Sequence, residues 1–247
     1  MKNKLFCGLC VLFLLFLSGC KQNRQVMRLQ KLEEGVSSPT TIEELKDAIS
    51  KYESRVQDIQ LAQTQVGIWY KILGTRYVDN KMYGEALDCF KKALEFYPDN
   101  QNIHYYVGLC AGYMAKASYD FEGTGFNSRR ENYLRLSEQA YLTAIQIENR
   151  YARALYALGV LYTFGSQPGE VGLNEPEKAI PYLERYLTIE TKDVQGMFVL
   201  ARAYYSVYEF QKACDMYDKI ISTTKSSQLK SQAQDLKQVV LGAMDEF

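Results

Sequence analysis

YKILGTRYVDNKMYGEALDCFKKALEFYP, the stretch from Tyr70 to Pro98, decides the fold. Its apolar residues recur three and four positions apart, which is the spacing of one face of an α-helix. Gly74 in the first half and Ala86 in the second lack bulk, so two helices can approach each other closely at these positions. Pro98 cannot continue a helix. The stretch therefore predicts two packed helices that end at Pro98.

The same two small-residue positions return along the chain. In the first helix of each unit they are Gly74, Gly108, Gly159 and Ala201, and in the second helix Ala86, Ser137, Ala179 and Ala213. The intervals are 34, 51 and 42 residues in the first series and 51, 42 and 34 in the second. A period of 34 residues with extra segments of 17 and 8 residues explains both series. The extra segments are expected at approximately residues 119–128 and 165–174, between the two helices of the second and third units.

A helix pair with this period and pattern resembles the tetratricopeptide repeat (TPR), with tyrosine in place of the usual leading tryptophan. The resemblance implies that Leu73, Tyr77, Phe90 and Ala93 fill the seam between the helices. It predicts an all-α, right-handed α-solenoid of about four TPR-like helix pairs, at residues 67–100, 101–151, 152–192 and 193–225. We also expect Asn174 to cap the second helix of the third pair.

Both flanks of the repeats are amphipathic. Residues 41–66 and 226–247 predict N-terminal and C-terminal capping helices, because the last unit of a repeat array otherwise leaves an apolar face in water.

The first forty residues predict an export signal and a tether. Lys2 and Lys4 precede thirteen apolar or small residues at 5–17, too few to span a bilayer of about 30 Å but enough for a secretory signal. The following Leu17–Cys20 resembles the lipobox of bacterial lipoproteins. The resemblance implies a signal peptide at 1–19, acylation (palmitate among the lipids) at Cys20, and a lipidated tether at 20–40. An uncleaved membrane anchor is the alternative. Lys21 in place of a retaining aspartate favours the periplasm-facing outer membrane within the cell envelope.

Composition and motifs argue against several function classes. The 29 basic and 29 acidic residues balance, so nothing indicates sequence-independent nucleic-acid binding. His104 is the single histidine, and we expect it to pack rather than to catalyse. No motif supports an enzyme, a metal site or a cofactor. Three cysteines in apolar helical stretches are expected as buried thiols, although the first two are close enough in sequence to suspect a disulfide: Cys89, Cys110 and Cys214.

A second face of the first helices carries aromatic and basic residues. In repeats that resemble the TPR, this face is similar to the concave groove that holds peptides. The predicted partner-binding residues are Lys71, Tyr105, Tyr113, Arg153, Tyr156, Phe198 and Arg202. Tyr119, Phe121 and Phe126 of the first insertion are predicted as further contacts, in one continuous surface with the groove. The alternative is that these rings only pack on neighbouring helices.

These features favour a lipid-anchored scaffold of the bacterial cell envelope. It would bind a protein or peptide partner and support an envelope assembly, secretion or transport complex. The alternative function is a lipid-tethered accessory of an envelope solute transporter, in which the tyrosines line a cleft for a small molecule.

Overall fold

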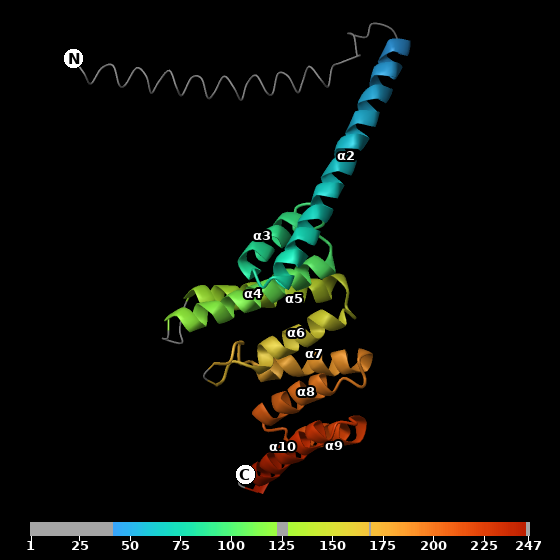
Figure 1. Cartoon of the computed structure of the whole chain (residues 1–247). Helices are drawn as coiled ribbons and strands as arrows, with labels where there is room; N and C mark the ends of the chain where they lie inside the picture. Colours follow the sequence, from blue (N-terminus) through green and yellow to red (C-terminus); the bar gives the residue numbers. More distant parts are fainter. Residues whose placement is uncertain (1–41, 123–127, 168, 246–247) are drawn as a thin grey trace, which may run out of the picture. The chain divides into compact units, whose positions relative to one another are not determined.

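A computed structural model describes residues 42–122, 128–167 and 169–245. Helices are the only regular secondary structure in these residues (Figure 1). They are α2 (Ile42–Asp79), α3 (Tyr83–Leu94), α4 (Gln101–Glu122), α5 (Ser128–Ile147), α6 (Ala152–Thr163), α7 (Pro176–Ile189), α8 (Val194–Ser206), α9 (Phe210–Thr223) and α10 (Ser227–Asp245). The chain divides into two compact units, Met1–Gln65 and Val66–Phe247. The predicted signal peptide, Cys20 and the tether lie outside the described residues.

One long helix replaces two expected ones. The capping helix predicted at 41–66 and the first helix of the first repeat are continuous in α2, which is 38 residues long. No proline or glycine occurs between Ile42 and Val66, so nothing in the backbone stops the helix before the first repeat.

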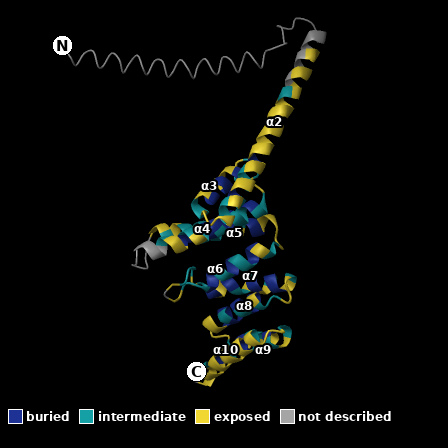
Figure 2. Cartoon of the chain, in the orientation of Figure 1, coloured by how far each residue is buried: buried dark blue, intermediate teal, exposed yellow. Residues whose placement is uncertain are grey.

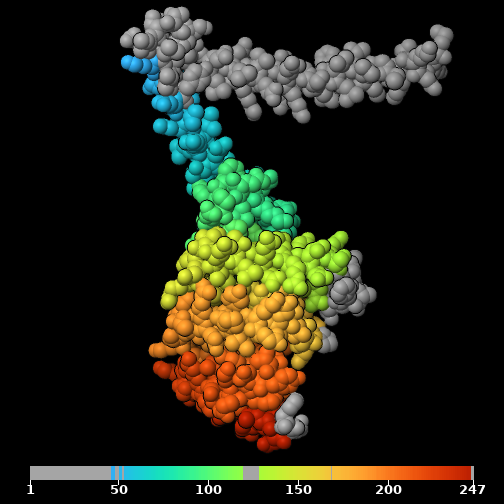
Figure 3. Space-filling model, turned by 180° about the vertical axis from the view of Figure 1, so that it is seen from behind, coloured from blue at the N-terminus to red at the C-terminus, as the bar shows by residue number. Residues whose placement is uncertain are grey.

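In the unit Val66–Phe247 the helices form stacked pairs, an α-solenoid. The pairs α4–α5, α6–α7 and α8–α9 each pack internally, and each pair also contacts the next. The first helices contact one another directly, α4 with α6 and α6 with α8, and α10 covers α9. In the space-filling view the layers of this unit follow one another in sequence order (Figure 3).

The predicted seam is confirmed by the contacts of its glycines. A Cβ added at Gly74 would lie 2.9 Å from the Phe90 ring, and one at Gly108 would lie 2.6 Å from the Tyr141 ring. The small residues of the second helices are almost completely buried, and the hydroxyl of Ser137 donates a hydrogen bond of 2.8 Å to the carbonyl oxygen of Gly108. In the first three pairs a large side chain of the second helix therefore lies directly on a glycine of the first helix.

The prediction that Leu73 fills the seam is wrong. Leu73 is 43% exposed, whereas its equivalents Val107, Leu158 and Leu200 are buried. Val107 belongs to the smaller cluster of buried residues, and Leu158 and Leu200 belong to the larger one, whereas Leu73 belongs to neither. No helix pair precedes the first repeat within the unit Val66–Phe247.

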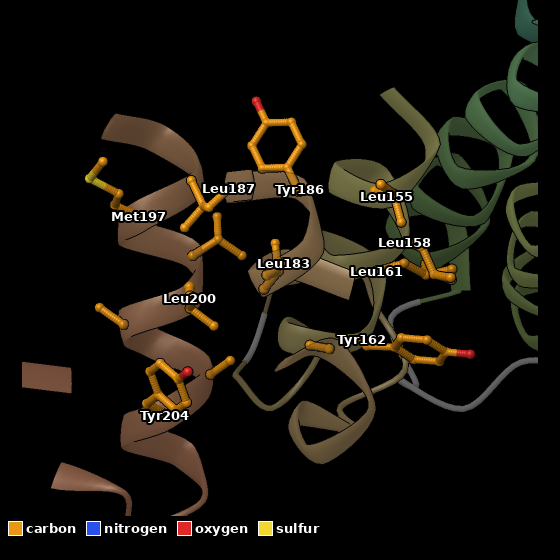
Figure 4. Close-up of a cluster of buried hydrophobic side chains, with 14 of the residues drawn as sticks. Leu155, Leu158, Leu161, Tyr162, Leu183, Tyr186, Leu187, Met197, Leu200 and Tyr204 are labelled. Carbon is orange, nitrogen blue, oxygen red and sulfur yellow. The ribbon is translucent and has the colours of Figure 1, made fainter. Parts of the chain in front are cut away.

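The buried side chains form two clusters in this unit. The smaller joins α3, α4 and Ala140 of α5, and the larger continues through the later pairs to Ala233 and Val240 of α10. Figure 2 shows that burial concentrates where helices face one another. Figure 4 shows part of the larger cluster, to which α6 contributes Leu158 and α7 contributes Leu183.

The first insertion lengthens helices instead of forming a long loop. The helix α4 has 22 residues and α5 has 20, against 12 in α6. Positions 119–122, which we expected in a loop, are the last turn of α4. The side chains of Tyr119 and Phe121, and the whole of Phe126, lie outside the described residues.

The second insertion is a folded loop at 164–175. Its backbone returns to the end of α6, with N–H to carbonyl distances of 2.8 Å for Leu173 to Leu161 and 2.7 Å for Glu175 to Tyr162. Asn174 does not cap α7 as expected. The N-cap is Glu175, and Asn174 instead has a left-handed backbone (φ 53°) and donates its N–H to the Phe164 carbonyl.

Glu170 fastens this loop to two repeats. Its carboxylate accepts hydrogen bonds from the backbone N–H groups of Gly165 and Gln167 and pairs with Arg202 of α8 at 2.5 Å. Its carbonyl oxygen accepts a bond of 2.9 Å from Arg130 of α5. Burial alone would raise the pKa of Glu170, but the bonds from Arg202 and the two N–H groups outweigh it and hold this pKa below its ordinary value.

The three expected thiols are free and buried: Cys89, Cys110 and Cys214. Burial raises the pKa of Cys110 to about 12, so its thiol stays protonated at neutral pH.

Replacing Gly108 by alanine should destabilise the unit by about 1–3 kcal/mol, because the added methyl group overlaps the buried Tyr141 ring. Urea denaturation followed by circular dichroism measures the change. Gly242→Ala is the matched control. No atom lies within 4 Å of the added group there, so alanine should stabilise α10 by about 0.5–1 kcal/mol. Equal effects of the two substitutions would contradict the seam.

Replacing Glu170 by glutamine should cost about 0.5–1 kcal/mol at neutral pH, as expected for a partly exposed ion pair. A carboxylate with a lowered pKa stabilises the fold fully above its ordinary pKa of 4.5 and loses this effect as the pH falls through the folded value. The difference from the parent should therefore disappear on acidification below that value.

Urea denaturation across this pH range is the measurement. The control is Glu95→Gln, which breaks the exposed pair with Lys92 and should change stability less. A difference that persists unchanged in acid would argue against the Glu170 contacts.

Candidate functional site

A hollow of about 530 Å³ lies between the first helices of the second and third repeats. Five tyrosines line it, and we call it the tyrosine hollow: Tyr105, Tyr113, Tyr141, Tyr156 and Tyr186. Leu109 and Val160, from α4 and α6, supply aliphatic wall between the rings. Val171 of the folded loop contributes to the same wall.

The repeat register puts the rings there. Tyr105 and Tyr156 occupy equivalent positions of α4 and α6, one residue after the seam stripe. Each ring is held by a second ring. The centroids of Tyr105 and Tyr141 are 5.9 Å apart, and those of Tyr156 and Tyr186 are 5.2 Å apart. Tyr113 stacks on Tyr83 of α3 at 4.0 Å. The lining is therefore preorganised before any ligand arrives.

The hydroxyls of Tyr105, Tyr141 and Tyr186 stay protonated at neutral pH. Burial is the main cause that raises the pKa of Tyr105, against an opposing effect of the nearby Arg153. Burial likewise raises the pKa of Tyr141 and of Tyr186, whose hydroxyl also donates a hydrogen bond of 2.8 Å to Asp193. These groups can donate and accept hydrogen bonds but carry no charge.

Two cations and one anion lie on the rim of the tyrosine hollow: Lys116, Arg153 and Glu190. Among the residues that the structure describes, neither Lys116 nor Arg153 makes an ion pair, and the side chain of Arg153 is exposed. The hollow thus combines a largely apolar wall with two cationic groups that have no carboxylate partner.

A second hollow, of about 580 Å³, lies between α8, α10 and the folded loop. Phe198, Tyr205, Leu236 and Val239 are part of its lining, and we call it the C-terminal hollow. Arg202 also lines it, but its guanidinium already pairs with Glu170 and lies over the Phe164 ring at 4.4 Å.

The structure divides the surface that we predicted as continuous. Tyr105, Tyr113, Arg153 and Tyr156 line the tyrosine hollow, whereas Phe198 and Arg202 line the C-terminal hollow. The two hollows share no lining residue. The folded loop separates them, since it gives Val171 to the first and Phe164, Ser166 and Gln167 to the second.

Lys71 belongs to neither of the two hollows and is half-buried on α2.

Several lining residues were missed from the sequence. Tyr141 and Tyr186 occupy the positions of Phe90 and Ala93 in later second helices, so the repeat register predicts a place in the seam for them and not in the groove. Lys116 follows Tyr113 by three residues on the same face of α4, so helical spacing would have found it. Glu190 comes from the end of α7, which only the packed fold brings to this place.

The single histidine contacts the backbone, and no cluster of metal ligands occurs in the described part of the chain. The ring of His104 lies 2.7 Å from the carbonyl oxygen of Pro98, as expected of a packing histidine. No group of three or more His, Cys, Asp and Glu residues there has a geometry that could hold a metal ion.

No family model matches the sequence. A TPR repeat-containing protein of Borreliella burgdorferi is 23% identical over 227 residues, which cover 90% of this chain and 93% of that protein.

Solved structures are similar to most of the chain. YrrB, described as a TPR protein with an unusual peptide-binding site, is 19% identical, with a TM-score of 0.52 over 78% of this chain and 85% of its own. MamA from Desulfovibrio magneticus RS-1 is 12% identical, with a TM-score of 0.52 over 73% of this chain and 92% of its own. These structures show the fold, an α-solenoid of helix pairs, and the Borreliella relative is itself a TPR repeat-containing protein.

Proposed function

We propose that this protein is a lipid-anchored TPR scaffold of the bacterial cell envelope that binds a protein or peptide partner in the tyrosine hollow. The bound partner would belong to an envelope assembly, secretion or transport complex. The observation that carries the proposal is an open, tyrosine-lined hollow whose two cations, Lys116 and Arg153, have no ion pair among the described residues.

The lining favours a partner with an apolar or aromatic side chain. Rigid tyrosines offer large contact area at little entropic cost, and aromatic residues with arginine are enriched among interface hot spots. Tyr105 and Tyr156 present such rings side by side from consecutive repeats. The description of YrrB as a peptide-binding TPR protein supports the same use of this fold.

The rim favours a carboxylate on the same partner. Neither Arg153 nor Lys116 has an ion pair within the described residues. A carboxylate of the partner can therefore pair with them without displacing a carboxylate of the protein. Arg202 differs, because a ligand there would first have to displace Glu170. We therefore assign the main contact to the tyrosine hollow, and not to Arg202.

The double variant Arg153→Glu with Tyr156→Ala should weaken binding at least about tenfold, because it removes one ring and reverses one charge of the hollow. A photo-crosslinker placed at Tyr113 in cells identifies the partner, and calorimetry with the purified partner then gives the affinity. Circular dichroism must first show unchanged helicity and melting.

The matched control is Lys91→Glu with Tyr208→Ala, which makes the same chemical changes at two exposed positions outside both hollows. It should bind like the parent chain. Undiminished affinity of the Arg153 and Tyr156 variant would place the partner site elsewhere on the solenoid.

The lipid anchor is the second part of the proposal and rests on the sequence at 1–20. None of the helices in the described residues is long and apolar enough to cross a membrane. Cys20→Ala should leave an unprocessed precursor and abolish incorporation of labelled palmitate, because the acylated thiol is gone. Gel mobility and labelling measure both effects.

Cys10→Ala, within the apolar run of the predicted signal, is the control and should be processed and labelled normally. Normal cleavage of Cys20→Ala would rule the anchor out. Fractionation of the parent chain would then test the expected outer-membrane location.

The alternative function, a small-molecule accessory of an envelope transporter, is supported by the volume and the apolar wall of the same hollow. About 530 Å³ lies within the range of small-molecule sites. A rise in melting temperature with a pure organic carboxylate, abolished in the Arg153 and Tyr156 variant, would favour this function over the scaffold.

A further inference from the structure

The part of α2 that belongs to the first unit carries a seven-residue repeat. With Ile49 and Val56 at position a, Leu45 and Ile59 fall at position d, and Tyr52 falls between them at the remaining d position. The pattern continues for three heptads without a helix-breaking residue. An apolar a/d repeat of this kind is the sequence pattern of a helix that pairs with another helix along a narrow seam.

The two apolar seam residues whose side chains the structure describes are exposed: Val56 is 52% exposed and Ile59 is 48% exposed. The described side chains between Lys46 and Gln65 are all exposed except that of Arg55, which is half-buried. The last apolar heptad of the stripe therefore faces solvent in the single chain.

We propose that residues 45–63 of α2 pair with the same segment of a second copy, in a parallel, two-stranded and in-register coiled coil. β-Branched residues at a favour two strands when leucine is at d, and Ile49 and Val56 at a with Leu45 at d follow this pattern. Gln63 occupies the next a position. In register, the two Gln63 amides meet across the seam and can hydrogen-bond, and a single polar a residue of this kind fixes register.

The flanking positions permit pairing with an identical helix. In a parallel pair, each g residue lies beside the e residue five positions later in the other copy. Ala48 then lies beside Glu53, and Arg55 beside Gln60, so no two like charges meet. Nothing at these positions selects a strongly acidic or basic partner. A second copy can therefore cover the apolar seam without repulsion between like charges. The proposed dimer does not depend on the function of the hollows.

Cysteine cross-linking tests the register. With Ile59→Cys, the two thiols of a parallel pair face each other, so mild oxidation of the full-length chain, expressed in a bacterial host, should give a disulfide-linked dimer. Leu61→Cys is the matched control, because position 61 is at f on the opposite face and is 69% exposed. Cross-linking at position 59 should be at least about tenfold faster than at 61.

Sedimentation velocity of the detergent-extracted chain tests the association itself. The parent should form a dimer whose fraction rises with concentration. Val56→Lys with Ile59→Lys should make it monomeric, and Gln63→Leu should raise the dimer fraction because an apolar residue replaces the polar one in the seam.

Three results would overturn the proposal. The first is a parent chain that stays monomeric at every concentration. The second is equal cross-linking at positions 59 and 61, which excludes the parallel register. The third is a monomer that binds lipid vesicles through Val56 and Ile59, which would assign the stripe to the membrane surface instead.

Discussion

The contact between a glycine of one helix and a large side chain of the next is the constraint on which the repeats depend. Gly108 against Tyr141 and Gly159 against Leu183 bring two backbones together where any Cβ would collide. This close approach fixes how the two helices of a pair lie, and the pair in turn fixes the face that the first helix turns away from the seam. Tyr105 and Tyr156 line the tyrosine hollow because each lies about 100° around its helix from that seam.

The sequence predicted the features that depend on local spacing, such as the register of the helix pairs. It did not predict the features that depend on tertiary contacts. The seam glycines follow a 34-residue period, so the register of the helix pairs could be read directly. Of the first insertion, residues 119–122 continue α4 and residue 128 begins α5, where the sequence predicted a loop. Glu170 and Arg202 are 32 positions apart, and their pairing depends on how the loop folds, which no helical periodicity encodes. This pairing holds the loop that contributes residues to both hollows.

The ion pair between Glu170 and Arg202 also decides which cations are available to a ligand. From the sequence, Arg153 and Arg202 looked equivalent, because both extend the aromatic face of a first helix. In the structure Arg202 is compensated by Glu170 and covered on one side by Phe164, whereas Arg153 has no ion pair among the described residues. A compensated cation offers a ligand little, since each new bond replaces an existing one. The cationic character of the binding face is thus concentrated at Arg153 and Lys116, on the rim of the tyrosine hollow.

The two proposed surfaces act on different parts of the chain and reinforce each other. The tyrosine hollow is built within the unit Val66–Phe247, and the heptad seam lies in the unit Met1–Gln65. A dimer through the seam carries two hollows, so a partner with two matching segments binds the second one at high effective concentration. A short seam of three heptads associates weakly in free solution, but anchoring both copies by Cys20 in one membrane would confine them to a surface and raise their encounter rate. Because a parallel pair directs both tethers to the same side, the lipid anchor favours the orientation that Gln63 specifies.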